Sequence, residues 1–354
     1  MFIAVRLLFT AAAASVGFDG WRASSWRRWD SGHYLDIARK GYEYFSCARF
    51  GGRAQDVCGN AAWFPLYPWL LRPLLALGVG PETAGAVVSG AGALAFLVAL
   101  WNAFLLRRGL KGLLLLGMAA VFPGAVYQQA IFPTSVALLC LVLAGEAVSR
   151  EAWARAGGFG ALLSLSYVTG VLIAPVQALV AFARTRALRP ALLAGGLAAL
   201  GLVAVMALHQ ITLGHWDAFY WVHRKGFPAM ARPLQAFWDI IWPATDPTSD
   251  PRARLVAAQA LTIAGLVALG LATALAMRRR PDRVRLWAVL TTLVFWTTPL
   301  VVGRGVSLYR SDALAFPVLF LLVELPVWLL APLLVWLGVL AYWMAQLFFT
   351  GYLV

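Results

Sequence analysis

The densest group of chemically active side chains in this 354-residue chain lies between residues 29 and 68. Asp30 opens the segment, and His33, Tyr34 and Asp36 follow it closely. A carboxylate at the edge of an apolar environment can act as a general base that removes a proton from a hydroxyl group. Asp30 also directly precedes a predicted helix, where Asp commonly caps the first turn. The sequence leaves both roles of Asp30 open.

The other polar residues of this segment are expected to contact a substrate rather than to hold a metal ion. His33 and Tyr34 can form hydrogen bonds, and Asp36 can either bond to a substrate or face water. No Cys and His residues have the spacing of a zinc site, and no two acids are one residue apart, as in sites that hold a metal with a nucleotide sugar. The sequence implies no soluble cofactor and gives no support for a metal.

The composition shows what surrounds this segment. Hydrophobic residues make up 62% of the chain and charged residues 12%, whereas soluble domains carry roughly 25% charged residues. We therefore expect an all-α polytopic membrane protein with one domain, residues 1–354. A membrane helix needs about 20 apolar residues, and the sequence predicts about eleven. They are residues 2–17, 63–79, 84–106, 110–130, 134–148, 157–182, 190–212, 254–276, 286–303, 311–325 and 327–350.

Two longer polar stretches separate these helices and are expected on the extracytoplasmic side: residues 18–62 and 213–253. Within the first loop, residues 31–40 are predicted to form an amphipathic helix, because Tyr34, Ile37 and Ala38 recur at helical spacing. A helix of this kind in a membrane protein is expected to lie on the membrane surface.

Two of the three cysteines, Cys47 and Cys58, belong to the same loop. Their thiols could form a disulfide if the loop faces an oxidising compartment. The sequence leaves this open, because it does not fix the distance between the two residues. Cys140 lies within a predicted membrane helix and is expected to serve only in packing.

Basic residues indicate the orientation of the chain in the membrane. The net charge is +14, and Arg and Lys of a membrane protein gather in cytoplasmic loops, so no nucleic-acid partner is expected. The basic groups at residues 184–189 and 278–285 predict two cytoplasmic loops and a cytoplasmic N-terminus. Those at residues 107–111 and 150–155 would then lie outside, which leaves the topology of residues 63–160 open. Only three of the 29 basic residues are Lys, a bias that favours a bacterial plasma-membrane protein.

The first loop contains a run of short motifs: Trp29-Asp30, His33-Tyr34, Ile37-Ala38, Gly41-Tyr42 and Phe64-Pro65-Leu66-Tyr67-Pro68. This run resembles the GPI mannosyltransferase II (PIG-V) family and its bacterial relatives, which are membrane glycosyltransferases of the GT-C class. Three later stretches are similar to family motifs in the same order: Ser166-Tyr167-Val168-Thr169-Gly170, residues 214–223, and Ser307-Leu308-Tyr309-Arg310 with Phe316-Pro317. The chain departs from the family at Tyr167, Thr169 and Ser311, and Phe132-Pro133-Thr134-Ser135 lacks the family's acid.

The resemblance implies a GT-C fold and an inverting transfer of a hexose, expected to be mannose. The donor would be a polyprenyl-phosphate-linked sugar, and the acceptor a lipid or glycan on the extracytoplasmic side. Asp30 would then be the catalytic base. The leaving phosphate gains negative charge, so cations should surround it. The candidates are Arg310, which matches the late motif, and Arg304, His223, Arg224 and Lys225; each could instead reach the membrane interface.

Tyr127 and Gln128 form a polar helix end that could line a sugar cavity. A polyprenyl-phosphate or lipid transporter would also need a basic cavity and interrupted helices, and a noncatalytic scaffold would need neither. The chain shows no internal repeat, which counts modestly against a transporter. A transferase requires the carboxylate of Asp30, whereas a transporter should tolerate its loss.

Overall fold

The computed structural model describes residues 1–50, 57–226, 234–279, 282, 284–302 and 308–353. In this part of the chain, five helices are long and apolar enough to cross a membrane: Pro81–Ala120, Val168–Thr185, Leu188–Leu213, Pro251–Ala276 and Val327–Phe349. Three shorter apolar helices accompany them: Phe2–Ser15, Thr134–Ser149 and Arg285–Val301. The structure is therefore that of an all-α membrane protein, as the composition predicts.

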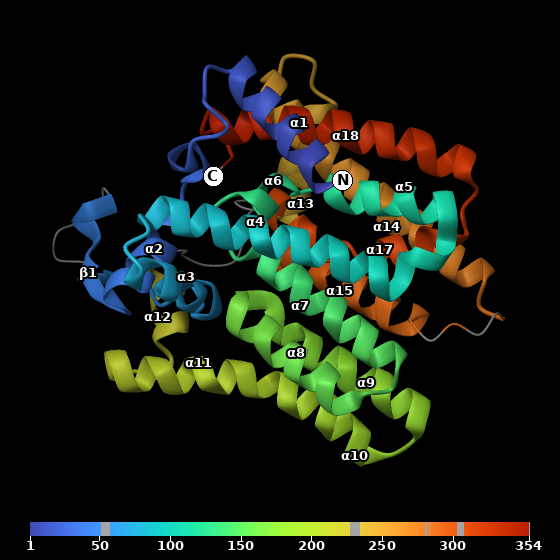
Figure 1. Ribbon diagram of the computed structural model, residues 1–354, viewed down its shortest axis with the longest axis horizontal. Helices are drawn as coiled ribbons and strands as arrows, with labels where there is room; N and C mark the ends of the chain where they lie inside the picture. The colour runs from blue at the N-terminus through green and yellow to red at the C-terminus, as the bar shows by residue number, and fades with distance from the viewer. Residues whose placement is uncertain (51–56, 227–233, 280–281, 283, 303–307, 354) are drawn as a thin grey trace.

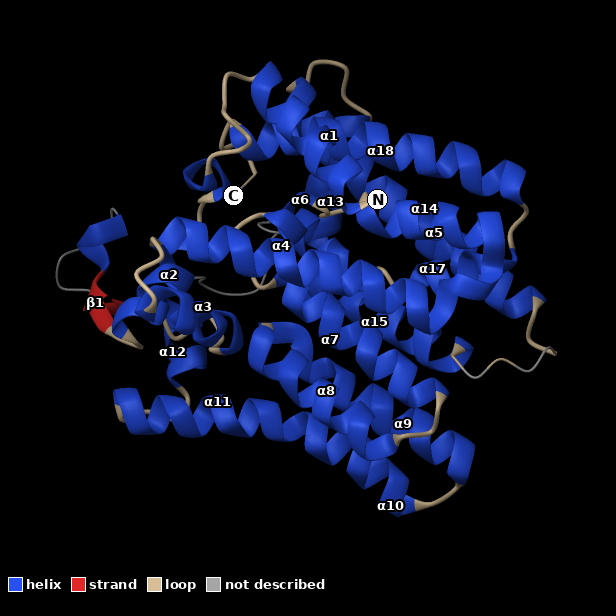
Figure 2. Ribbon diagram, in the orientation of Figure 1, coloured by secondary structure: helices blue, strands red, loops and turns tan. Residues whose placement is uncertain are grey.

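Helices form almost all of the regular structure (Figures 1 and 2). The first half contains α1 (Phe2–Ser15), α2 (Ser31–Lys40), α3 (Leu66–Ala76), α4 (Pro81–Leu100), α5 (Gly109–Ala120), α6 (Val126–Gln129), α7 (Thr134–Ser149) and α8 (Trp153–Ser166). The second half contains α9 (Ile173–Thr185), α10 (Leu188–Ala191), α11 (Leu197–Leu213), α12 (Ala218–Gly226), α13 (Gln235–Ile241), α14 (Pro251–Ala276), α15 (Arg285–Val302), α16 (Leu308–Ser311), α17 (Val318–Leu321) and α18 (Val327–Phe349).

Short 3-10 and π segments join or extend these helices. They are η1 (Ala23–Trp26), η2 (Cys47–Phe50), η3 (Trp101–Leu105), η4 (Leu106–Arg108), η5 (Val168–Leu172), η6 (Leu192–Gly196), η7 (Trp242–Ala244), η8 (Asp312–Ala315) and η9 (Leu322–Glu324). Two strands in the first loop, β1 (Tyr44–Ser46) and β2 (Val57–Gly59), pair antiparallel with Phe45 opposite Cys58. Cys47 and Cys58 form a disulfide next to this pair.

The predicted amphipathic helix is present as α2, and its apolar face is buried. Tyr34, Leu35, Ile37 and Ala38 are each at most 7% exposed. The ring of Tyr34 contacts that of Tyr67 on α3 edge to face, with centroids 5.6 Å apart. Neighbouring parts of the protein therefore cover the apolar face of this helix.

A buried asparagine fixes the segment after α2. The side-chain oxygen of Asn60 accepts a hydrogen bond from the backbone N–H of Glu43 (2.9 Å), and its side-chain nitrogen donates to the carbonyl of Gly41 (3.2 Å). The hydroxyl of Tyr42 donates to the carbonyl of Trp63 (2.8 Å). These bonds hold the end of α2 against the segment that leads into α3, although the two are distant in sequence.

Four predicted membrane segments differ from the structure. Residues 110–130 break after α5 at Ala120, and residues 311–325 form only the short turns η8, α17 and η9. The segment over residues 63–79 contains α3, whose 11 residues extend about 16 Å, roughly half of a bilayer core. The segment over residues 157–182 is two helices, because α8 ends at Ser166 and the chain turns through η5 into α9. Gly170 allows this turn, since a Cβ there would lie 2.2 Å from the carbonyl oxygen of Leu163.

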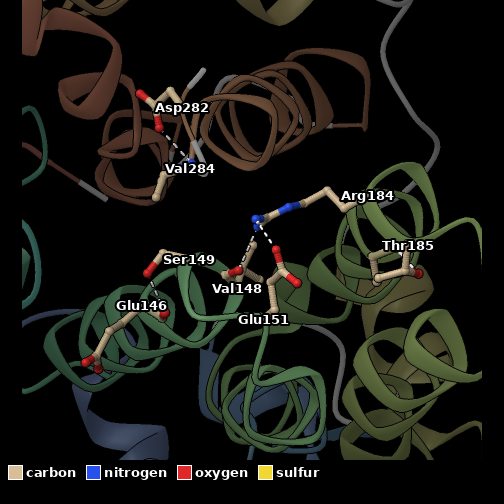
Figure 3. Close-up of polar contacts among 9 residues, drawn as sticks. Glu146, Val148, Ser149, Glu151, Arg184, Thr185, Asp282 and Val284 are labelled. Atoms are coloured by element: carbon tan, nitrogen blue, oxygen red, sulfur yellow. Dashed lines mark hydrogen bonds and ion pairs between the residues drawn. The ribbon is translucent and has the colours of Figure 1, made fainter. Parts of the chain in front are cut away.

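Helices α8 and α9 run antiparallel. Arg184, near the end of α9, bonds to the carboxylate of Glu151 (2.7 Å) and the carbonyl of Val148 (2.9 Å), just before α8 begins (Figure 3). Figure 3 also shows Asp282, at the α14–α15 connection, in the same region. Asp282 in turn lines a small cavity with Arg108.

The basic connections therefore gather at one end of the molecule, which we call the far end. It holds the connections at residues 106–109, 150–152 and 185–188, Asp282 and Val284 of the α14–α15 connection, and Glu324, which pairs with Arg108 at 3.7 Å. When α3 is left out of the count of membrane helices and residues 157–182 are counted as two, the basic groups at residues 107–111, 150–155, 184–189 and 278–285 fall on one side in the topology count. At the opposite end, which we call the cavity end, α2, α3, α12 and β1 cluster (Figure 1).

Candidate active site

The central feature of the cavity end is an ion pair between residues 280 positions apart. The guanidinium of Arg310 lies 2.5 Å from a carboxylate oxygen of Asp30. Their side chains are 17% and 27% exposed, respectively. Asp30 occupies the N-cap position of α2, yet its side chain makes no capping hydrogen bond. The carboxylate is thus directed to a cation from the other end of the chain, and the capping role considered for it is not what the structure shows.

Aromatic residues surround Arg310. Its guanidinium carbon lies 5.3 Å from the centre of the Phe132 ring. Burial by itself lowers the pKa of Arg310, but the carboxylate of Asp30, together with the nearby Tyr167, Tyr127 and Tyr34, raises it above its ordinary value. Arg310 therefore remains a cation throughout the physiological range.

Tyr34 is a neutral neighbour of the pair. Burial, followed by the negative charge of Asp30, raises its pKa well above the usual value of a tyrosine. The phenol consequently keeps its proton and can serve as a hydrogen-bond donor or acceptor, but not as a base at neutral pH.

Asp30 and Arg310 form part of the wall of a cavity of about 160 Å³. Four separate segments line it: Asp30 and Tyr34; Ala62, Trp63 and Phe64; Ser166, Tyr167 and Val168; and Arg310. The volume equals that of about five water molecules, which is enough for one small ring and too little for a whole lipid-linked sugar. The wall combines one ion pair and a few hydroxyl groups with flat aromatic surfaces.

The backbone before α2 aims Asp30 at the cavity. Trp29 has a φ of +46°, which is unfavourable for a bulky residue and occurs where the surrounding structure enforces it. Arg28, one residue earlier, donates to the carbonyl of Phe349 (2.9 Å), and its guanidinium lies over the ring of Phe18 (4.8 Å). The end of α18 thereby holds the chain just ahead of Asp30.

A second set of contacts positions Arg310. The side-chain nitrogen of Gln259, on α14, donates to the carbonyl of Tyr309 (2.8 Å) and to a carboxylate oxygen of Asp312 (3.0 Å). Gln259 and Asp312 are only 1% and 4% exposed. One side chain of the long helix α14 thus fixes Tyr309, which directly precedes Arg310, and Asp312, which follows it by two residues.

The structure brings together some of the predicted site residues and separates others. Asp30, Tyr34 and Arg310 line the cavity. His33 stacks on Trp63 at 3.6 Å between ring centres, so it supports a wall residue. Asp36 is half-buried and is not among the lining residues.

The predicted pair at the helix end is not among the residues that line the cavity. Gln128 donates to the carbonyl of Ala119 (3.2 Å). Tyr127 is 1% exposed and packs edge to face on Phe132, and it is close enough to Arg310 to affect its pKa. Arg304 and the side chains of His223, Arg224 and Lys225 lie outside the described residues.

Sequence reasoning assigned no role to Ser166 or Tyr167, which complete the cavity wall. Two signals were available: the similarity of residues 166–170 to a family motif, and a polar residue inside a predicted membrane helix, which marks either a cavity or a break in the helix. Within the described part of the chain, no three His, Cys, Asp or Glu side chains are close enough to hold a metal ion. Comparison of the chain with protein-family models and with curated proteins finds no match.

Proposed function

We propose that this protein is an inverting membrane glycosyltransferase that moves a hexose, expected to be mannose, from a polyprenyl-phosphate donor to a lipid or glycan acceptor. The observation that carries the proposal is the Asp30–Arg310 pair in a cavity of about 160 Å³. A carboxylate can act as the base, and a guanidinium can stabilise the leaving phosphate. The resemblance of the first loop to the PIG-V family supports the same assignment.

In this mechanism the carboxylate of Asp30 accepts the proton of the acceptor hydroxyl. The acceptor oxygen forms a bond to the anomeric carbon as the bond from that carbon to the phosphate oxygen breaks. The polyprenyl phosphate leaves with the bonding electrons, and Arg310 stabilises its added negative charge. Attack from the face opposite the leaving group inverts the anomeric configuration.

The contact between the two side chains implies an exchange of partners. Guanidinium binds phosphate through two parallel hydrogen bonds, so the donor phosphate competes with Asp30 for Arg310. Binding of the donor would release the carboxylate toward the acceptor. The donor should therefore bind before the acceptor, and Asp30 should be shielded until the donor is in place.

We also propose the topology and location of the site. The chain would cross the membrane eleven times in a GT-C-type arrangement, with α3 left out and α8 and α9 counted separately. The disulfide between Cys47 and Cys58 is typical of an oxidising compartment and favours an extracytoplasmic cavity end. The basic far end is then cytoplasmic, as expected in a bacterial plasma membrane.

The direct test uses purified wild-type protein with polyprenyl-phosphate mannose and a lipid extract. Mass spectrometry should detect free polyprenyl phosphate and a hexosylated acceptor, and NMR of the product should show an inverted anomeric centre. The Asp30→Asn variant should yield neither product. If no member of a panel of polyprenyl-phosphate hexoses is consumed by the wild type, the proposal is wrong.

A polyprenyl-phosphate transporter gives a different result in the same preparation. In sealed vesicles it would move labelled lipid between leaflets without breaking the sugar–phosphate bond. Asp30→Asn would leave such movement largely intact, since no proton needs to be removed. Lipid movement without donor cleavage would therefore replace the transferase proposal with the transporter.

A further inference from the structure

Ser166 is the one lining residue of the cavity, within the described part of the chain, whose buried side-chain polar atom has no hydrogen-bond partner. It is the last residue of α8 and is 1% exposed. Its hydroxyl shares the cavity wall with Asp30 and Arg310. A buried hydroxyl that lacks a partner destabilises the folded state, so its presence there needs an explanation.

A neighbouring serine shows that the helix could have satisfied this hydroxyl. Ser164 is fully buried on the same helix, and its hydroxyl lies 2.9 Å from the carbonyl oxygen of Gly160 and 3.0 Å from that of Ala198. Bonding to the carbonyl four residues earlier is common for a helical serine. Ser166 makes no such bond, although Ser149 and Thr185, which end α7 and α9, bond to carbonyls three and four residues earlier.

The rest of the cavity wall suggests which ligand would bond to Ser166. Trp63, Phe64 and Val168 offer apolar surfaces, on which the C–H faces of a sugar ring can pack. Asp30 and Arg310 bond to each other, and during the proposed reaction they serve the acceptor and the phosphate. The hydroxyl of Ser166 is then available to bond to a group on the sugar ring, which lies between the acceptor and the phosphate.

We propose that the Ser166 hydroxyl binds one hydroxyl group of the transferred hexose and thereby helps to select the sugar. This inference rests on the proposed glycosyl transfer. It adds a specificity residue to a site whose base and phosphate-binding cation are otherwise assigned. A site that hydrogen-bonds a substrate hydroxyl rejects the analogue that lacks it, because its own polar group is then left unpaired.

The test compares the wild type with Ser166→Ala on polyprenyl-phosphate mannose and on its 2-, 3-, 4- and 6-deoxy forms. For the wild type, one of these deoxy donors should react with a kcat/KM about tenfold below that of mannose, as expected for one hydrogen bond. Ser166→Ala should lower kcat/KM for the mannose donor by a similar factor. Its kcat/KM for the affected deoxy donor and for the mannose donor should then be equal. The other deoxy donors should keep the same ratio to mannose in both proteins.

Ser164→Ala is the matched control. It removes a hydroxyl of the same helix, but one whose hydrogen bonds are made to backbone carbonyls of the protein. It should lower the thermal midpoint and leave the preference among donors unchanged. Ser166→Ala should leave the midpoint unchanged or raise it, since it removes an unpaired buried group. If Ser166→Ala does not fold, Ser166→Gly carries the same donor comparison.

The outcomes separate this inference from the proposed function. Suppose that the wild type transfers sugar and that the Ser166 variants show the same ratios of kcat/KM among the five donors. Ser166 then does not bind a hydroxyl of the hexose, and the transferase proposal stands. If the wild type cleaves no donor, the proposed function and this inference both fail. Selective loss of discrimination at one sugar position supports both.

Discussion

The two ends of the molecule each hold a close pair of an arginine and a carboxylate. At the cavity end, Arg310 and Asp30 are 2.5 Å apart; at the far end, Arg184 and Glu151 are 2.7 Å apart. The arginine side chains are almost equally exposed, at 17% and 18%. Geometry and burial of the arginine therefore do not distinguish the pairs.

Their surroundings do distinguish them. Arg184 also donates to the carbonyl of Val148 and lies over Trp153, 5.7 Å from the ring centre, so it joins the α7–α8 turn to α9 (Figure 3). Its partner Glu151 is 49% exposed. The Asp30–Arg310 pair instead borders a cavity that contains an unpaired buried hydroxyl. An ion pair is a candidate for chemistry when a cavity and unused polar groups adjoin it.

The largest expected difference between the two ends is the effect of losing the carboxylate. Asp30→Asn should lower the rate of transfer by roughly 10²–10⁴-fold, the contribution of a general base. Glu151→Gln, the same change at the far end, should leave the rate within about twofold, because a partly exposed ion pair contributes little. Steady-state release of polyprenyl phosphate measures both. Equal losses from the two variants would contradict the comparison.

Removal of the arginine should give the next largest difference. Arg310→Gln should lower the rate by roughly 10²–10³-fold, as expected when a group that stabilises developing negative charge is lost. Arg184→Gln should keep the rate and lower the free energy of unfolding by about 1 kcal/mol or less. Initial-rate assays and thermal denaturation in the same detergent test this. If Arg310→Gln kept the wild-type rate, another cation would have to stabilise the leaving phosphate.

The smallest expected effect concerns the competition for Arg310. Asp30→Asn should bind the polyprenyl-phosphate donor about two- to tenfold more tightly than the wild type, because the phosphate no longer displaces a carboxylate; this is within the range of one hydrogen bond to a charged group. Glu151→Gln should bind it with unchanged affinity. Calorimetric titration with a non-cleavable donor analogue measures the change. Weaker donor binding by Asp30→Asn would show that the carboxylate helps to hold the donor.

Much of the local structure could be predicted from the sequence. The composition indicates a helical membrane protein, and the spacing of Tyr34, Ile37 and Ala38 predicts α2, which spans Ser31–Lys40. These predictions succeed because hydrophobicity and helical periodicity are local properties of the chain. The sequence left the disulfide between Cys47 and Cys58 open. The pairing of β1 with β2 brings the two cysteines together in the structure.

The membrane segments were predicted less well where the chain turns inside an apolar stretch. Residues 157–182 contain no charged residue that would mark a loop, and the turn depends on Gly170 fitting against the carbonyl of Leu163. Such close packing between two parts of the chain leaves no trace in hydropathy. The same turn brings Ser166 and Tyr167 into the cavity wall.

The sequence by itself determined that this chain is a helical membrane protein and that Asp30 and Arg310 are residues capable of acid–base and phosphate chemistry. Composition and spacing could not place them together, because they are 280 positions apart and no local rule relates their positions; only the resemblance to a family suggested a shared site. The tertiary structure decided that Asp30 pairs with Arg310 instead of capping α2, and that Ser166 adjoins them. Long-range packing made these choices, since a buried charge requires a partner wherever in the chain one can be found.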